Sequence, residues 1–173
     1  YPEGSNLGQI TGYLGEVTGE MLEAYPEREY VSGEIAGRSG LESSQDDLLR
    51  GRPGYRFYVQ PQDESRILLA EKQVAAGKDV TITIDSRMQE LAYQVLGDRI
   101  GALVVLDAET GAILTLASTP SYDPNEFIGG ISTARWQELS RDLRRPMFNR
   151  ALQGLYPPGS VFKVVTVASA LDQ

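Results

Sequence analysis

The fold is decided by residues 102–118, ALVVLDAETGAILTLAS, in which two apolar runs flank a short polar loop. The runs 102–106 and 112–118 are rich in aliphatic and β-branched residues, which favour strands. The loop 107–111 between them has turn-forming residues and suits a hairpin. Both runs are nearly continuous in apolar residues, so we expect each strand to be covered on two faces.

The residues before this hairpin predict a strand and then a helix. Residues 80–84 (VTITI) alternate β-branched side chains, which is typical of a strand. Ser86 and Gln89 have the spacing of a capping box, so we expect the helix to begin at Ser86. One face of this helix is apolar at intervals of three and four residues, and its members are Met88, Leu91, Ala92, Val95 and Leu96.

The segment after the hairpin predicts a turn and two helices. Residues 122–125 (YDPN) are typical of a turn, and residues 133–140 suit a polar helix. A last helix, largely apolar, is expected from Ser160 to the end of the chain.

Residues 1–75 predict short elements joined by turns rather than a large independent core. Glycines and prolines interrupt the apolar stretches repeatedly, and both residue types end helices. The expected elements are a strand over 9–15, a helix over 20–24 that Thr18 caps and Pro26 stops, a helix over 44–49 between the turns 37–42 and 50–54, and strands over 55–60 and 66–71.

Composition excludes several classes of chemistry. The chain has 173 residues with no His and no Cys, which removes imidazole bases, Ser-His-Asp triads, thiolate nucleophiles, disulfides and Cys or His metal sites. The net charge of −8 argues against a nucleic-acid partner. Every apolar run is far shorter than the ~20 residues of a membrane span, and no signal peptide is recognisable. Because residue 1 is Tyr, we expect the natural start to lie upstream.

The chemistry that remains points to residues 156–163, YPPGSVFK. Two prolines and a glycine force an extended approach and a tight turn, and Ser160 then lies in the first turn of a helix. Lys163 is three residues further on, so both side chains share one helix face. A serine becomes a nucleophile when a base removes its proton, and a lysine with a lowered pKa is the candidate base here. Phe162, Val164 and the sheet could supply the apolar wall that lowers it.

A plainer interpretation stands beside this one. A Ser followed three residues later by a Lys is common by chance, with Ser160 then a helix cap and Lys163 a solvated charge. Other polar groups carry similar pairs of interpretations. They are Asp107 with Glu109, as an acid/base pair or as turn carboxylates; Asp123, Asn125 and Glu126, as a sparse calcium site or a turn; and Arg141, Arg144 and Arg145, as a solvated face or a contact for an anionic ligand.

The segment 149–163 (NRALQGLYPPGSVFK) resembles the nucleophile motif of class B penicillin-binding proteins, the monofunctional transpeptidases of bacterial cell-wall synthesis. Many members carry Thr where Val161 stands. Further blocks resemble the family in its order along the chain. They are 37–42 and 49–54, similar to the last box of the non-catalytic pedestal module; 79–85 with Gln89, similar to the first strand and helix of the transpeptidase domain; and 101–114 with 117–125, similar to its first hairpin.

The resemblance implies an α+β fold with an irregular, elongated pedestal portion over 1–75. The N-terminal part of a transpeptidase domain, a sheet flanked by helices, would follow over 76–173. It also implies a D,D-transpeptidase that cross-links peptidoglycan stem peptides through an acyl-enzyme on Ser160, with Lys163 as base and the Ser160 N–H as one oxyanion donor. No cofactor or metal is implied. β-Lactam antibiotics, which mimic D-Ala-D-Ala, would acylate the same serine.

The family's two other motifs, Ser-x-Asn and Lys-[Thr/Ser]-Gly, do not occur after Lys163, because only ten residues follow it. We therefore expect a fragment that is inactive alone, from a protein with its membrane anchor outside this chain. The family implies a place on the extracytoplasmic face of the bacterial inner or cytoplasmic membrane. A membrane glycan polymerase would contact the pedestal. Two alternatives are an interaction module of the cell-wall machinery, and a β-lactam sensor or β-lactamase relative.

Overall fold

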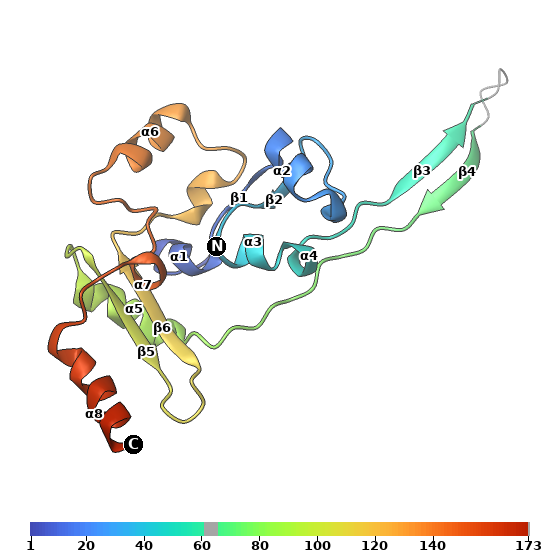
Figure 1. The fold of residues 1–173 in the computed structure, drawn as a ribbon. Helices are drawn as coiled ribbons and strands as arrows, with labels where there is room; N and C mark the ends of the chain where they lie inside the picture. Colours follow the sequence, from blue (N-terminus) through green and yellow to red (C-terminus); the bar gives the residue numbers. More distant parts are fainter. Residues whose placement is uncertain (61–65, 173) are drawn as a thin grey trace.

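The computed structural model describes residues 1–60 and 66–172, and it has an α+β architecture. Three separate antiparallel strand pairs organise the described chain, β1 with β2, β3 with β4, and β5 with β6. Figure 1 shows β5 and β6 beside the helix α5, while β3 and β4 project far from the rest of the molecule. None of the helices in the described residues is long and apolar enough to cross a membrane.

The N-terminal region is built from short elements, as its glycines and prolines predict. Along the chain they are η1 (Gly4–Asn6), α1 (Gly8–Thr11), β1 (Leu14–Glu16), α2 (Gly19–Ala24), η2 (Pro26–Arg28), β2 (Ile35–Gly37), α3 (Gly40–Ser44) and α4 (Asp46–Leu49). The Thr18 hydroxyl accepts a hydrogen bond from Met21 N–H at 3.4 Å, so the predicted cap of α2 is confirmed. The helix expected over 44–49 begins earlier, at Gly40, and is interrupted at Gln45.

The strand predicted over 9–15 is wrong in its first half. Residues 9–11 belong to α1, and the chain turns extended only after Gly12, whose φ is +75°. A Cβ on Gly12 would lie 1.9 Å from the carbonyl oxygen of Ser39, so two backbones touch here. This close contact determines the path of the chain at Gly12. The apolar pattern around Ile10 could not predict it, because Ser39 is distant in the sequence.

A buried ionic network holds β2 to α4. Asp46 is 3% exposed and accepts hydrogen bonds from the Tyr30 hydroxyl at 2.8 Å and from Gly37 N–H at 2.9 Å. Arg50 lies 3.3 Å from Asp46 and also pairs with Glu34 at 2.9 Å. A buried carboxylate is tolerated because it is paired and hydrogen-bonded on several sides. The network therefore fixes the point at which the chain leaves α4.

From that point the chain runs into a long hairpin, which we call the arm. Its strands are β3 (Tyr55–Val59) and β4 (Ile67–Lys72), which confirms the two strands predicted there. Arg56 faces Glu71 across the pair, with their side chains 2.7 Å apart. Every residue of both strands is exposed, and the large apolar ones among them are Tyr55, Phe57, Tyr58, Val59, Ile67, Leu68 and Leu69.

Two extended legs connect the arm to the body. They are joined by a bridge between Arg52 and Ala75, with N–H to O distances of 2.7 and 3.0 Å, and by a bond from Lys78 N–H to Leu48 O at 2.7 Å. The strand predicted over 80–84 is wrong: these residues are extended but belong to no strand of the described chain. The Thr83 hydroxyl donates a hydrogen bond to Ile113 O of β6 at 2.6 Å. This contact is made by a side chain, so it is not part of a backbone ladder between strands.

The hairpin predicted from residues 102–118 is confirmed as β5 (Gly101–Leu106) and β6 (Ile113–Thr119). β6 is buried from Thr115 to its end, whereas β5 alternates between half-buried and exposed residues. The expectation that both strands are covered on two faces is therefore wrong for β5. The helix α5 (Ser86–Leu96) packs mainly on β6, which leaves alternate side chains of β5 uncovered.

α5 begins where the sequence predicts, but its cap is a different residue. The Asp85 carboxylate accepts hydrogen bonds from the N–H groups of Arg87 and Met88, and Ser86 is already helical. Gln89 does not turn back to a capping box. Its side-chain amide pairs with both backbone groups of Leu116, at 2.9 and 2.8 Å, and is 1% exposed.

The amide of Gln89 therefore acts like one more residue of a neighbouring strand, and it closes the outer edge of β6. On the apolar face predicted for α5, Ala92 is buried, while Met88, Leu91 and Val95 are exposed.

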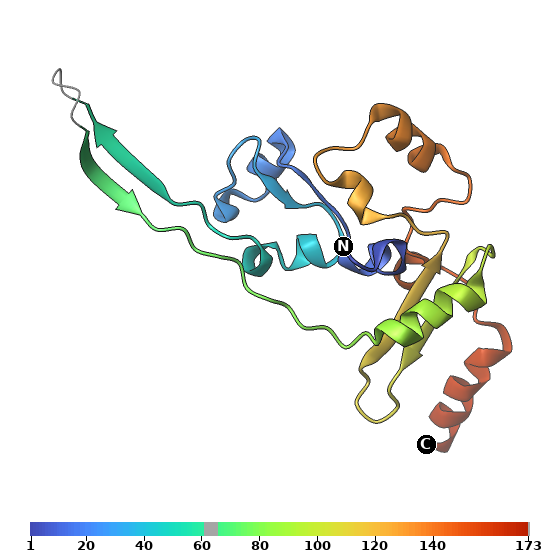
Figure 2. The same cartoon turned by 180° about the vertical axis from the view of Figure 1, so that it is seen from behind.

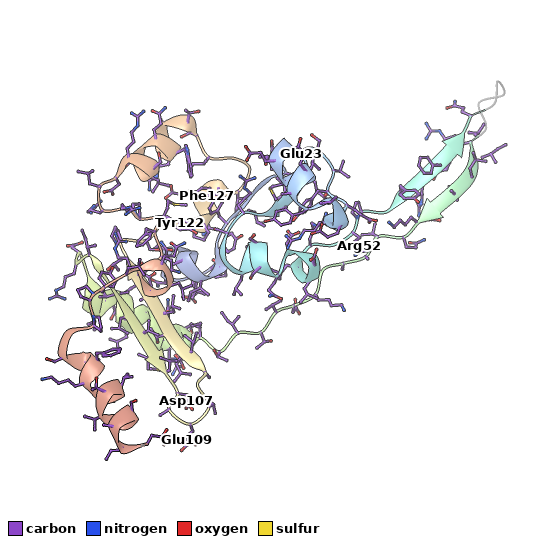
Figure 3. All side chains as sticks on the ribbon, in the orientation of Figure 1. Glu23, Arg52, Asp107, Glu109, Tyr122 and Phe127 are labelled. Atoms are coloured by element: carbon purple, nitrogen blue, oxygen red, sulfur yellow. The ribbon has the colours of Figure 1, made fainter. Side chains whose placement is uncertain are left out.

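The remaining elements follow β6. They are η3 (Pro124–Phe127), α6 (Thr133–Arg141), α7 (Arg150–Gln153), η4 (Gly159–Phe162) and α8 (Lys163–Leu171). Tyr122, Phe127 and Leu139 form a buried apolar cluster that also contacts Tyr13 of the N-terminal region. Figure 3 shows Tyr122 and Phe127 where the loop to α6 meets that region. The cluster joins the two halves of the chain.

Candidate active site

The segment that leads to Ser160 is anchored by α7. Asn149 caps α7 by accepting a hydrogen bond from Leu152 N–H at 3.2 Å, and its amide donates to Gln9 O at 3.1 Å. Arg150 N–H donates to the Ser118 hydroxyl of β6 at 3.0 Å. Residues just before the candidate nucleophile are thus bound to both the sheet and the N-terminal region. Sequence reasoning assigned no role to Asn149 or Arg150, although Asn is a frequent helix cap.

Gly159 makes the turn into the helical segment. Its φ is +54°, in the left-handed region that glycine adopts at little cost, and it follows Pro158 with φ −68°. A Cβ at this glycine would meet nothing within 4 Å, so its requirement is one of backbone conformation and not of space.

Ser160 and Lys163 lie on one continuous helical path. Ser160 is the second residue of the 3₁₀ turn η4, and Lys163 is the first residue of α8. The backbone N–H of Lys163 donates a hydrogen bond to Ser160 O. The helix predicted from Ser160 onward is therefore present, with a tighter first turn, and Gln173 lies outside the described residues. Side chains three residues apart in a 3₁₀ turn lie one above the other. The backbone thus places the two side chains on the same line, although no hydrogen bond joins them in the described structure.

The apolar wall expected beside Lys163 is not provided by the described residues. Ser160 and Lys163 are both exposed, and so are Phe162 (54%) and Val164 (73%). Figures 1 and 2 show α8 to one side of β5 and β6, without covering the face of the strand pair. A helix that is apolar all round is normally a buried one. In the described structure, α8 therefore lacks the cover that its apolar composition favours.

The carboxylate of Asp107 takes the plainer of its two interpretations. Asp107 accepts hydrogen bonds from Thr110 N–H and its hydroxyl, both at 2.7 Å, and from Glu109 N–H at 3.1 Å. These bonds, first that of the Thr110 side chain, lower the pKa of Asp107. Figure 3 places Asp107 and Glu109 in the loop that joins β5 and β6. Asp107 is a turn-capping carboxylate.

Asp123 similarly caps η3 by accepting from the Asn125 N–H and side-chain amide, at 2.9 and 2.8 Å. In the described part of the chain, no group of three acidic side chains is placed to hold a metal ion. Within the basic run, Arg144 pairs with Asp142 at 2.9 Å.

Two family models match the chain. The model of the penicillin-binding protein dimerisation domain matches residues 1–82, and that of the penicillin-binding protein transpeptidase domain matches residues 101–173. Ser160 and Lys163 lie in the second match.

Curated relatives match nearly the whole chain. The peptidoglycan D,D-transpeptidase MrdA of Acinetobacter baumannii is 37% identical over 99% of this chain and 26% of its own length. Penicillin-binding protein 3 of Bacillus subtilis is 39% identical over 97% of this chain and 25% of its own length. The chain thus spans about a quarter of the length of these relatives.

Solved structures share the arrangement of the elements. A complex of PBP2 with MreC from Helicobacter pylori matches with a TM-score of 0.87 at 32% identity, over 100% of this chain and 32% of that one. PBP2 of Pseudomonas aeruginosa matches with a TM-score of 0.81 at 35% identity, over 99% and 34%.

Proposed function

This chain belongs to the penicillin-binding proteins, and we propose that it carries the nucleophile of a peptidoglycan D,D-transpeptidase. The observation that carries the proposal is the placement of Ser160 and Lys163 on one helical line directly after the left-handed Gly159. These 173 residues contain no His and no Cys, so within them a serine with a nearby lysine is the available pair. The substrates we propose are stem peptides that end in D-Ala-D-Ala.

In the proposed reaction, the Ser160 hydroxyl oxygen attacks the carbonyl carbon between the two D-Ala residues. Lys163, as the neutral amine, takes the hydroxyl proton, and the N–H of Ser160 stabilises the oxygen that becomes negative. The peptide bond then breaks, the terminal D-Ala leaves with a proton, and an ester on Ser160 remains. The amine of a second stem peptide attacks this ester, which forms the cross-link and returns the proton to Ser160.

The same attack would open the amide of a β-lactam ring and leave an ester on Ser160. This offers the direct test: a protein of the relatives' full length that contains this chain should be labelled by a fluorescent penicillin. Ser160→Ala should abolish the labelling. Ser169→Ala, at an exposed serine of the following helix α8, is the matched control and should leave it intact. Labelling that survives Ser160→Ala would refute the assignment.

The 173 residues alone should not cross-link peptides, because Ser160 and Lys163 are both exposed and the groups of a catalytic site act only as an assembled unit. We further propose that the chain divides near residue 75 into a pedestal portion and a transpeptidase portion. In this proposal the whole protein works on the extracytoplasmic face of the bacterial membrane, with its anchor outside these residues.

A second candidate function, as an interaction module, is favoured by the arm. Its strands expose apolar residues on both faces, and isolated two-stranded hairpins are only marginally stable in water. We propose that the arm contacts another part of the cell-wall machinery, such as a membrane glycan polymerase. Phe57→Ser with Leu69→Ser, in the full-length protein, should reduce co-purification of that partner several-fold while penicillin labelling is kept. Unchanged co-purification would exclude the arm as the contact.

A further inference from the structure

A cavity of about 440 Å³ lies where the N-terminal region packs against the residues that precede α7. Its lining combines Tyr13 and Ser39 from the first part of the chain with Trp136, Asn149 and Gln153 from the second. It is separate in sequence and structure from Ser160, which does not line it. Its size is in the range of small-molecule sites, which begins at about 300 Å³.

One wall of the cavity is aromatic. The rings of Tyr13 and Phe127 are stacked with centroids 4.0 Å apart, and Tyr122 meets Tyr13 edge to face at 6.0 Å. Tyr122 is 4% exposed, so this part of the wall is fixed, while Trp136 is 41% exposed. The tyrosine side of the cavity therefore presents packed aromatic rings that a ligand ring could contact.

The lining also includes polar groups, and hydrogen bonds hold them in place. Asn149 N–H donates to the Gln153 side-chain oxygen at 3.2 Å, and the Asn149 amide donates to Gln9 O at 3.1 Å. The Ser39 hydroxyl lies 3.5 Å from the Tyr122 hydroxyl. The Gln153 NH₂ group and the Tyr13 hydroxyl have no hydrogen-bond partner among the described residues, so both can serve a ligand.

Among the residues that line the cavity, none has an ionisable side chain of Asp, Glu, Lys or Arg. A charged ligand would lose its hydration there without gaining a counter-charge, which selects against it. Hydroxyl and amide groups that both donate and accept, in one cavity with aromatic rings, match a neutral ring with apolar faces and hydroxyl edges. A sugar ring has this chemistry.

We propose that this cavity binds an uncharged N-acetylated amino-sugar ring of the glycan strand. This proposal rests on the proposed function, since the relatives are named as peptidoglycan enzymes. The Gln153 NH₂ group would donate to the sugar's oxygen atoms, and the ring face would lie against Tyr13. The site would hold the glycan backbone, while Ser160 acts on the peptide attached to it.

Trp136 is the only tryptophan of the chain, and it lines the cavity, so its fluorescence reports on occupancy. The probe is the trimer of N-acetylglucosamine, titrated into the 173-residue chain. We expect a saturable change in emission with a dissociation constant on the order of 1 mM, typical of a neutral ligand held by few bonds. Saturation-transfer NMR on the sugar gives a second readout that does not depend on the tryptophan.

Gln153→Ala should weaken this binding about three- to tenfold, because it removes the NH₂ donor from the lining. It also removes the acceptor of the Asn149 N–H bond, so circular dichroism should confirm that the variant is folded like the wild type. The matched control is Gln137→Ala, an exposed glutamine on the same helix as Trp136 that does not line the cavity, and it should bind as the wild type does.

No response to the sugar by either readout up to 50-fold above the expected constant, on the order of 50 mM, would overturn the proposal. Equal binding by Gln153→Ala would also overturn it, as would a saturable response to an uncharged apolar tripeptide but not to the sugar. Penicillin labelling of Ser160 in the full-length protein is independent of these results. If the wild-type protein bound the sugar but was not labelled by penicillin, the proposed function alone would be refuted. If it was labelled at Ser160 but did not bind the sugar, the cavity proposal alone would be refuted.

Discussion

Two hairpins of the described chain have similar lengths and the same antiparallel pairing, but they differ in how far other elements cover them. In the arm, β3 and β4 expose every residue, and the two strands stand away from the body (Figure 2). In β5 and β6 the same antiparallel ladder carries α5 on it, and Gln89 closes the edge of β6. Leu69 of β4 is 64% exposed, while Leu116 of β6 is 6% exposed.

The comparison teaches that apolar strand residues reveal pairing but not burial. Both hairpins have strand-forming side chains, and both form. Whether a hairpin is covered depends on elements far away in the sequence, such as α5 for β6. The packed hairpin should therefore carry most of the stability of the described fold, and the arm little of it.

The largest effect should come from a matched pair of leucines. Leu116→Ala removes a buried side chain and leaves a cavity, so we expect the free energy of unfolding to fall by about 3 kcal/mol. Leu69→Ala in the arm should change it by less than about 0.5 kcal/mol. Urea denaturation followed by circular dichroism measures both. Similar losses for the two variants would mean that the arm is packed in solution.

A loss of about 2 kcal/mol is expected for Gln89→Ala, because two backbone groups of Leu116 and the carbonyl of Asn6 lose their partner in a site closed to water. Gln94→Ala on the same helix is the control. Its side chain makes one long, exposed bond of 3.3 Å to Glu90, so its unfolding free energy should hardly change. Hydrogen exchange should also show Leu116 N–H losing protection in Gln89→Ala alone.

The next effect is the pH dependence of the free energy of unfolding, to which the packed hairpin should contribute and the arm should not. Burial raises the pKa of Tyr93, which packs by β6, and of Tyr122 above the ordinary value of 10.0. As pH rises, the unfolded chain loses these two protons before the folded chain does. The contribution of the two tyrosines to the free energy of unfolding is therefore fully present below pH 10 and is lost as pH rises through their folded-state pKa values. Denaturation between pH 8 and 11 should show this fall, and Tyr93→Phe should reduce it. Tyr58→Phe in the arm is the exposed control. A flat profile in the wild type would contradict the prediction.

The smallest effect concerns the ion pair of the arm. Arg56 and Glu71 are 2.7 Å apart, but Arg56 is 61% exposed, so Arg56→Ala should lower the unfolding free energy by less than about 0.5 kcal/mol. A double-mutant cycle with Glu71→Ala measures the coupling between the two side chains. Coupling above about 1 kcal/mol would show that the pair is shielded from water and that the arm is covered.

Local patterns predicted much of the fold. Residues 102–118 specify the hairpin, Thr18 the cap of α2, and the prolines and glycines the breaks in the first part. What failed depends on partners distant in sequence. Residues 80–84 look like a strand but reach β6 mainly through Thr83, and the path at Gly12 is set by Ser39.

For the candidate site, the spacing of Ser160 and Lys163 was enough to place them on one helical line. Their exposure could not be predicted, because burial of α8 depends on surfaces beyond its own sequence. The cavity beside Tyr13 was not predictable either, since its walls come from both ends of the chain.

The bridge between the two legs of the arm has a mechanical consequence. The leg that follows β4 continues directly into α5, while the other leg ends at α4 (Figure 1). Tension on the strands β3 and β4 therefore divides between α4 and α5. Any difference in stretch between the legs is a shear load on the Arg52–Ala75 bonds and on the bond from Lys78 to Leu48. These three hydrogen bonds hold the two legs together. The full tension on the second leg acts on α5 only after they have broken.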